Sequence, residues 1–239
     1  MKTFTIGHSN NSIETFIRLL MQHGVTAVAD VRSSPYSRRF PQFNQASLKA
    51  ALKTTNIAYV PLCNHLGARP NDRSCYVEGM ARYDLIAATE AFAIGLNRLI
   101  KGAKQHQITL MCAEQDPIVC HRAILVCPHL KKAGLEIQHI HKNGELESHE
   151  YLEARLLKIH NLDKFLHLSK DFDDVNQSGK QLSLFDINPY DINPRQIDTI
   201  AKPVVREELI QKAYQLQAER IAYVEETNRE QYQSHEQAS

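Results

Sequence analysis

The sequence lacks both a long apolar run and a strong net charge. A transmembrane helix needs about 20 consecutive apolar residues, and no such run exists among the 239 residues, so we predict no membrane contact. A net charge of +1 argues against a strongly basic surface that coats nucleic acid, although a local basic patch is still allowed. The apolar stretch at the start of the chain is too short for a signal peptide. We therefore expect a cytoplasmic protein.

Cysteine is scarce, odd in number and never arranged as Cys-x-x-Cys. With 43% hydrophobic residues, a chain of this length can build a core without covalent cross-links. An odd number of thiols in a reducing compartment does not form a disulfide framework. We expect the five cysteines to be free thiols, metal ligands or catalytic groups: Cys63, Cys75, Cys112, Cys120 and Cys127.

Strand and helix signals alternate through the first 160 residues. Apolar β-prone runs predict strands at 4–6, 25–31, 57–62, 108–112 and 136–140, and helical patterns cover 12–23, 45–53, 85–104 and 121–133. We expect Gly24 to end the first helix, Asn44 to cap the second, and Pro128 to kink or shorten the last. This alternation predicts an α/β fold, with a mostly parallel sheet covered by helices on both faces.

The composition changes after about residue 160. Residues 171–180 are polar and typical of a linker, and 207–232 have a broken apolar stripe that predicts a terminal helix. We therefore divide the chain into an α/β domain, 1–160, and an extension, 161–239, with a linker and a helix. Four histidines are expected to lie on a helical surface in contact with solvent: His141, His149, His160 and His167.

The strongest candidate for a catalytic site lies between the fourth strand and the following helix. It contains Cys112, Glu114, Cys120, His121 and Arg122. Ligands bind at the carboxyl ends of strands in open α/β sheets, and a helix N-terminus favours anions and thiolates. We expect Cys112 to be nucleophile or ligand and Cys120 its partner thiol, with Glu114 and His121 moving protons and Arg122 holding an anionic group.

Two alternatives stay open for this cluster. The thiols could be small buried hydrophobes beside a Glu114–Arg122 ion pair. Cys112, Cys120 and His121 could instead bind zinc or iron, with His139 or Cys63 as a fourth ligand. The nine residues between Cys112 and Arg122 make the segment too long for the short cradle of thiol phosphatases. No cofactor is predicted otherwise.

A second group of candidates follows the first two strands. Asp30, Arg32, Ser37 and Arg38 follow the second strand, while His8 and Ser9 end the first. Arginines, aromatic rings and hydroxyls in one segment suit a phosphate or a nucleotide. We expect these residues to bind substrate and to form the wall of a cleft opposite Cys112. The alternative is an ordinary polar loop in which Asp30 pairs with Arg32.

Taken together, these motifs resemble a known family. They are Ile6-Gly7-His8-Ser9, Asp30-Val31-Arg32-Ser33 with Pro35 and Ser37-Arg38, Cys112-Ala113-Glu114, Cys120-His121-Arg122 and His139-Ile140. The pattern is similar to the bacterial family catalogued as domain of unknown function 488, over about residues 1–160. The resemblance implies an α/β domain with these residues around one cleft and implies no particular reaction. The chain departs at Leu66-Gly67-Ala68-Arg69, where members usually carry Leu-Gly-Gly.

A short peptide in the extension resembles another known motif. The segment Gln181-Leu182-Ser183-Leu184-Phe185 resembles the pentapeptide by which many bacterial replication and repair proteins dock to the sliding clamp, with Gln181, Leu182, Leu184 and Phe185 as the expected contacts. Leu184 and Phe185 would enter an apolar pocket while Gln181 sets the register by hydrogen bonds. The alternative is a strand or loop that covers the core of the domain.

These observations predict a cysteine-dependent enzyme that acts on a phosphate-bearing substrate. The substrate would be DNA or a nucleotide, and the sliding clamp would recruit the enzyme to DNA. Two other classes stay open. One is a non-catalytic nucleic-acid-binding adaptor of DNA repair or replication, and the other is a metal or redox thiol protein.

Overall fold

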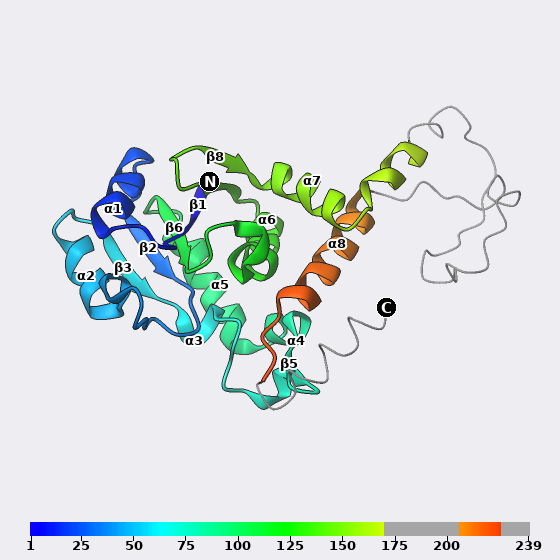
Figure 1. Ribbon diagram of the computed structural model, residues 1–239, viewed down its shortest axis with the longest axis horizontal. Helices are drawn as coiled ribbons and strands as arrows, with labels where there is room; N and C mark the ends of the chain where they lie inside the picture. Colours follow the sequence, from blue (N-terminus) through cyan, green and yellow to red (C-terminus); the bar gives the residue numbers. More distant parts are fainter. Residues whose placement is uncertain (170–205, 226–239) are drawn as a thin grey trace, which may run out of the picture. The chain divides into compact units, whose positions relative to one another are not determined.

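The computed structural model describes residues 1–169 and 206–225 (Figure 1). The predicted linker and the peptide with Gln181, Leu182, Leu184 and Phe185 lie outside the described residues. Within the described ranges, no helix is both long and apolar enough to cross a membrane.

A six-stranded sheet forms the centre of the fold, in the order β3-β2-β6-β1-β7-β8. Neighbouring strands from β3 to β7 are parallel, and β8 is antiparallel to β7. The strands are β1 (Lys2–Gly7), β2 (Ala27–Asp30), β3 (Ala58–Pro61), β6 (Ile108–Cys112), β7 (Glu136–Ile140) and β8 (Leu146–Ser148). The predicted α/β class with a mostly parallel sheet is confirmed.

Helices and short turns connect the strands. The α-helices are α1 (Ile13–Gln22), α2 (Gln45–Lys53), α3 (Cys63–Leu66), α4 (Tyr83–Ala87), α5 (Glu90–Gly102), α6 (Cys127–Lys132), α7 (His149–Ile159) and α8 (Arg206–Ile221). The 3₁₀ turns are η1 (Pro41–Phe43), η2 (Arg73–Cys75), η3 (Pro117–Val119) and η5 (Asp163–Ser169), and η4 (Arg122–Val126) is a π-helix. A separate hairpin consists of β4 (Tyr76–Val77) and β5 (Met80–Ala81).

Local signals explain most of these boundaries. Ser12 caps α1 by accepting a hydrogen bond from the Thr15 N–H at 3.2 Å, and Gly24 ends the turn after it with φ of 65°. Asn44 precedes α2 as predicted, but its side chain does not cap the helix. Its Oδ1 accepts from the Ser37 N–H at 2.6 Å, so Asn44 holds the preceding loop instead.

Three predicted helices differ from the observed ones. The span 85–104 contains two helices, because the Thr89 hydroxyl accepts from the Phe92 N–H and starts α5 there. In the span 121–133, Pro128 lies in the first turn of α6, where its missing N–H costs nothing, and the preceding turn is the π-helix η4. In the described part of the span 207–232, which ends at residue 225, the helix ends at Ile221, and Val224 pairs with Met80 as an isolated β-bridge.

Two helical layers enclose the sheet, with α1 and α2 on one face and α5 and α6 on the other (Figure 1). The first layer packs Phe16, Leu20 and Leu48 against Phe4 and Val28 of the strands, and all five side chains are buried. Burying a side chain of this size contributes about 2 kcal/mol. This packing, more than helix propensity, keeps α1 and α2 on the sheet.

The topology places a switch point at β6. The chain leaves β1 and β2 toward the face covered by α1 and α2, and it leaves β6 toward the face of α6 (Figure 1). Strand β6 lies between β2 and β1, so the chain diverges on either side of its carboxyl end. Beyond the strands, the His8 N–H bonds to the Cys112 carbonyl and the Ser9 N–H to the Ala113 carbonyl, both at 2.9 Å. Such switch points are where open α/β sheets bind ligands.

Contacts along the chain divide it into two compact units. Of the described residues, 1–152 and 217–225 belong to the first, and 153–169 and 206–216 belong to the second. In the second, Tyr214 donates a hydrogen bond to the Glu153 carboxylate at 3.3 Å, and both side chains are buried. The described segment 217–225 therefore groups with the N-terminal unit. The boundary at residue 160 stays a prediction.

Candidate functional site

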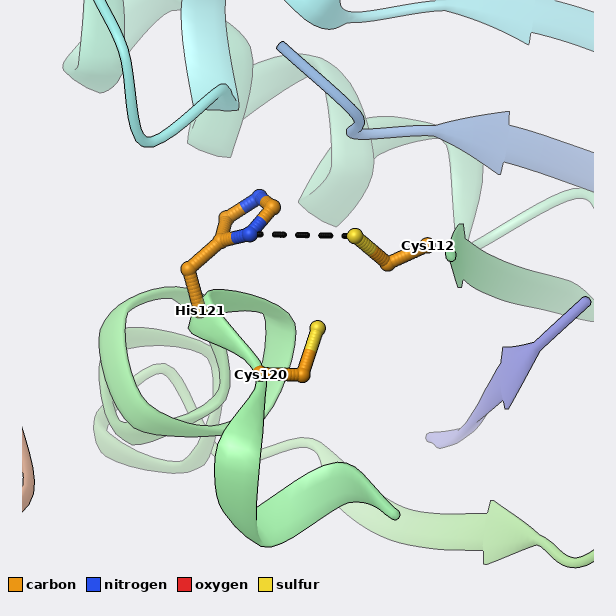
Figure 2. Close-up of side chains that lie close together, drawn as sticks. All are labelled: Cys112, Cys120 and His121. Carbon is orange, nitrogen blue, oxygen red and sulfur yellow. Dashed lines mark hydrogen bonds between the residues drawn. The ribbon is translucent and has the colours of Figure 1, made fainter. Parts of the chain in front are cut away.

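The structure brings Cys112, Cys120 and His121 together at the end of β6 (Figure 2). Cys112 is the last residue of the strand, and the other two precede the π-helix η4. The Cys112 Sγ lies 3.7 Å from His121 Nδ1, and the ligand atoms of all three side chains lie within 4.8 Å of one another. All three are buried, with exposed fractions of 3%, 1% and 8%. The sequence predicts that these three residues lie in one cluster, and in the fold they do.

A compact loop returns the chain from Cys112 to Cys120. The Asp116 carboxylate accepts from the Ile118 N–H at 3.1 Å and begins the turn η3, with Pro117 as its first residue. Cys120 follows the turn directly. The loop therefore depends on local capping, and this capping sets the distance between the two thiols.

Glycine at position 7 lets this loop pass close to β1. A Cβ atom built on Gly7 would lie 1.8 Å from the Glu114 carbonyl oxygen and 2.7 Å from its carbon. No side chain fits at that distance, because the contact is to backbone. The glycine of the Ile6-Gly7-His8-Ser9 motif thus serves the cysteine loop.

Charges around Cys120 favour its thiolate. Burial alone would raise its pKa, but a hydrogen bond from the Cys112 thiol and the positive charges of Arg122 and His121 outweigh burial, and the pKa of Cys120 falls well below its ordinary value. The hydrogen bond to Cys120, together with burial, raises the pKa of Cys112 well above its ordinary value. Cys120 is therefore the thiol that ionises more easily, and the catalytic roles expected from sequence for Cys112 and Cys120 stay predictions.

The Glu114 carboxyl completes the surroundings of Cys120. Its Oε2 lies 3.0 Å from the Cys120 sulfur. Burial and the negative charge of Cys120 raise the pKa of Glu114. The Cys120 thiol donates to this oxygen, so a proton passed along the bond leaves a thiolate beside a carboxylic acid that is a proton source within reach of the sulfur.

A backbone carbonyl fixes the His121 ring. Its Nε2 lies 2.9 Å from the Val31 carbonyl oxygen. A carbonyl only accepts, so Nε2 carries a hydrogen and Nδ1 faces the thiols. Burial would lower the pKa of His121, but Cys120 and Glu114 outweigh it and raise the pKa. The two shifts share a cause, because a negative charge on Cys120 and a positive charge on His121 each favour the other.

The buried Arg122 side chain holds the loop between Cys112 and Cys120 by hydrogen bonds. This side chain is 0% exposed and donates to the Glu114 carbonyl at 2.7 Å, the Gln115 carbonyl at 3.1 Å and the Thr5 hydroxyl at 3.3 Å. It thus contacts the backbone of Glu114 and is not hydrogen-bonded to its carboxylate. We expected Arg122 to hold an anionic ligand, but in this structure these donors bind the protein and its charge acts on Cys120.

From Arg122, a chain of hydrogen bonds continues through Thr5 and His139 to His149. The Thr5 hydroxyl lies 2.8 Å from His139 Nδ1, and His139 Nε2 lies 3.0 Å from His149 Nδ1. His149 is 1% exposed, so the expectation that it contacts solvent is wrong. Burial, the largest effect, and the charge of Lys131 lower its pKa to about 4. No sequence motif signals Thr5 or His149, because the strand register decides what they contact.

Asp30 and Arg32 form a closed pair, as the polar-loop alternative states. Arg32 donates to both Asp30 carboxylate oxygens, at 2.9 and 2.6 Å, and to the Phe43 carbonyl at 2.9 Å. Tyr59 donates to the same carboxylate at 2.8 Å. The Asp30 and Arg32 side chains are buried, so Arg32 is not presented to a ligand.

This pair and the thiols lie on opposite faces of the sheet. Asp30 aligns with Met111, which belongs to the core under α1 and α2. Cys112 is the next residue and points to the other face, because successive side chains of a strand alternate. The single cleft with two walls predicted from sequence is thus two adjacent clusters at one edge of the sheet.

His8, Ser9, Ser37 and Arg38 surround the same edge. The His8 ring stacks on Phe43 at 4.3 Å, and burial lowers its pKa to about 4. The Ser9 hydroxyl is 3.5 Å from Gln115 Oε1, beside the cysteine loop, and the Ser37 hydroxyl accepts from the Phe40 N–H at 3.1 Å. Arg38 is exposed. The proposed substrate role of these residues stays a prediction.

The expected fourth metal ligands lie elsewhere. His139 bonds to Thr5 and His149, and the Cys63 thiol lies 3.7 Å from the Asp30 carbonyl. Burial and the charge of Asp30 raise the pKa of Cys63 to about 11. Among the described residues, the gathered donor atoms are those of Cys112, Cys120 and His121, and the Glu114 carboxyl lies beside one of them, Cys120.

Sequence reasoning also missed Tyr83. This side chain begins α4 and is 8% exposed. Burial raises its pKa, and the negative charges of Cys120, Cys112 and Glu114 raise it further, which places the phenol near the thiols. Its distance along the chain from the cysteine motif hides it from any local pattern.

The fold and the site together define an open α/β domain with a buried thiol–imidazole cluster at its switch point. Residues 12–127 match the family model described as Domain of unknown function DUF488, and this part of the chain belongs to that family. The resemblance drawn from the motifs is confirmed. No curated protein and no solved structure matches the chain. The matched span includes both thiols and His121 but ends before His139.

Proposed function

We propose that the protein is a cysteine-dependent enzyme with Cys120 as its nucleophile. The observation that carries the proposal is the set of groups around this sulfur. The Glu114 carboxyl lies 3.0 Å from this buried sulfur, and the Cys112 sulfur and a His121 ring nitrogen lie within 4.8 Å of it, at the switch point of the sheet. A buried structural cysteine needs none of these.

The chemistry follows from the roles of these groups. The Cys120 thiolate attacks an electrophilic atom of the substrate, and the bond to the leaving group breaks as the sulfur bond forms. Glu114, 3.0 Å from the sulfur, gives its proton to the leaving group. Before the attack, His121 and Cys112 stabilise the thiolate form of Cys120. Water then releases the covalent intermediate, with the Glu114 carboxylate taking a proton from it.

The substrate class we propose is a phosphate-bearing nucleic acid or nucleotide. The position at a switch point supports it, and so does the exposed segment beside the site, where Arg38 is exposed and Tyr36 is 64% exposed. We further propose that Gln181, Leu182, Leu184 and Phe185 bind the sliding clamp. Co-purification with the clamp should be lost when Leu184 and Phe185 are replaced by alanine. Equal retention of both forms would contradict the clamp proposal.

A covalent intermediate is the direct test of the enzyme proposal. Incubation with oligonucleotides that carry terminal phosphates should give a mass adduct on Cys120 or a shortened product. Cys120→Ser should give neither, and Cys63→Ser is the matched control because its thiol has a raised pKa. Identical product from wild type and Cys120→Ser would refute the nucleophile. Binding without turnover in both would favour a nucleic-acid-binding adaptor.

A metal centre is the second candidate function. The donor atoms of Cys112, Cys120 and His121 are already gathered, with the Glu114 carboxylate beside Cys120. The His121 Nε2–H bonded to a backbone carbonyl is also the usual support of a metal-ligating histidine. Elemental analysis of purified protein decides this. Stoichiometric zinc or iron that Cys112→Ser loses would establish the metal centre, and its absence would remove this candidate.

A further inference from the structure

A phosphate-bearing substrate requires a cation whose hydrogen-bond donors are not already used by the protein. Two of the three arginines of the motifs, Arg32 and Arg122, fail this requirement, whereas the third, Arg38, is exposed in the loop beside the Asp30–Arg32 pair. Arg32 binds Asp30 and a carbonyl, and Arg122 binds two loop carbonyls and a hydroxyl. Resting on the proposed function, we propose that Arg69, stacked on Tyr223, is the residue that binds the substrate phosphate at the edge of the thiol site.

Arg69 differs from its two arginine neighbours. Arg73 is paired with Glu225, and Arg82 is paired with Asp84. Arg69 is exposed, and among residues 1–169 and 206–225 it has no hydrogen bond or ion pair. Its guanidinium carbon lies 4.2 Å from the centre of the Tyr223 ring. Stacking uses the face of the guanidinium and leaves its N–H edge for two parallel bonds to a phosphate.

The segment that carries Arg69 lies against the loop that orients His121. A Cβ on Gly67 would lie 2.9 Å from the Ser33 Cα, so the two backbones are in close contact. Ser33 is two residues after Val31, whose carbonyl holds the His121 ring. Tyr83 also lies near both groups, because the charges of Arg69 and of the two thiols all affect the pKa of its phenol.

The chain's C-terminal segment supplies the Tyr223 platform and also contacts the cysteine loop. Tyr223 is held through its carbonyl, which accepts from the Ala81 N–H at 2.8 Å, and the neighbouring Val224 pairs with Met80. Earlier in the same segment, Gln217 is 1% exposed and donates to the Ile118 carbonyl at 2.8 Å, two residues before Cys120. The segment 217–225 therefore connects Arg69 with the turn that presents the nucleophile.

Binding of short fluorescein-labelled single-stranded DNA, measured by anisotropy at several salt concentrations, tests the proposal. Arg69→Ala should weaken binding about tenfold and reduce the salt dependence by about one phosphate contact. Tyr223→Leu should weaken binding in the same direction, and Tyr223→Phe should bind like wild type because the ring is kept. Arg98→Ala is the matched control, since it removes one exposed charge from α5. Equal binding by Arg69→Ala and Arg98→Ala would overturn the proposal, as would no binding by wild type.

Two further measurements identify the kind of phosphate that binds and test the phosphate site separately from the enzyme proposal. If inorganic phosphate competes with the DNA, Arg69 binds a terminal phosphate. If inorganic phosphate does not compete and the DNA still binds, Arg69 binds a phosphodiester of the DNA backbone. The ultraviolet absorbance of the Cys120 thiolate should be unchanged in Arg69→Ala. If Arg69→Ala loses binding while wild type forms no Cys120 adduct, the phosphate site stands and the nucleophile proposal fails. If the adduct forms equally in both, with equal binding, the phosphate site fails alone.

Discussion

At the scale of single residues, the site is defined by the groups that favour a negative charge on the buried Cys120 sulfur. Cys120 is 1% exposed, and burying an isolated charge is costly. The structure offsets this cost with a thiol donor and with the charges of Arg122 and His121. Cys127 lies near Arg122 too, yet burial dominates there and raises its pKa. Donors near the sulfur, and not burial or a nearby arginine alone, therefore distinguish the lowered pKa of Cys120 from the raised pKa of Cys127.

The Cys112 hydrogen bond therefore has a measurable effect. Replacing Cys112 with alanine removes the donor, so the pKa of Cys120 should rise and its thiolate should appear only at higher pH. Because the wild-type pKa is lowered, the wild-type thiolate should persist at neutral pH and be lost as pH falls. Ultraviolet thiolate absorbance against pH, with Cys120→Ser as blank, measures both curves. A curve for Cys112→Ala that overlays the wild-type curve would refute this account.

At the scale of elements, β6 and the loop after it carry the site. The strand lies between β1 and β2, and hydrogen bonds from His8 and Ser9 continue the sheet past its end. Gly7 is the tightest point, because the Glu114 carbonyl passes where a side chain would be. The geometry of the cysteine loop is thus set by the neighbouring strand.

Gly7→Ala should consequently destabilise the protein and disturb the site together. The added methyl group would clash with backbone, which cannot move without shifting the loop, so we expect a loss of about 2–3 kcal/mol in the free energy of unfolding. Urea unfolding measures the loss, and thiolate absorbance reports the site. Gly24→Asn is the control, because Gly24 has no neighbour within 4 Å and asparagine tolerates its positive φ. A Gly7→Ala protein as stable as Gly24→Asn would contradict the close contact.

At the scale of the whole molecule, buried neutral histidines make stability depend on pH. The pKa values of His8 and His149 are both lowered to about 4, from an ordinary value near 6.5. Their contribution to the free energy of unfolding is complete above pH 6.5 and is lost as pH falls toward 4. In this range the histidines of the unfolded chain bind protons, whereas those of the folded chain stay neutral. Each side chain should cost about 2 kcal/mol of stability near pH 5.

The His149→Gln variant isolates one of these contributions. It should be less stable than wild type at neutral pH, because the bond to His139 changes, yet lose less stability on acidification. Urea unfolding at neutral pH and near pH 5 gives the difference. Equal loss in the variant and in wild type would show that His149 does not titrate on unfolding.

Sequence patterns predicted the elements better than the contacts of their side chains. Apolar periodicity located the strands, and Ser12 and Gly24 marked α1, because these signals are local. The span 85–104 is an exception, because Thr89, a common type of cap, starts a new helix inside it. The clustering of Cys112 with Cys120 and His121 was predictable, since a strand end and a helix start meet at one edge of a parallel sheet.

The sequence by itself determined the α/β alternation, the family and the residues that gather at the end of β6, because periodicity and motif spacing are properties of the chain. Only the tertiary structure decided what those residues contact. Strand register placed Asp30 and Cys112 on opposite faces, burial turned Arg32 and Arg122 inward, and the return of segment 217–225 brought Tyr223 under Arg69. Hydrogen-bond partners and local charge depend on groups far apart in the chain, and folding alone brings those groups together.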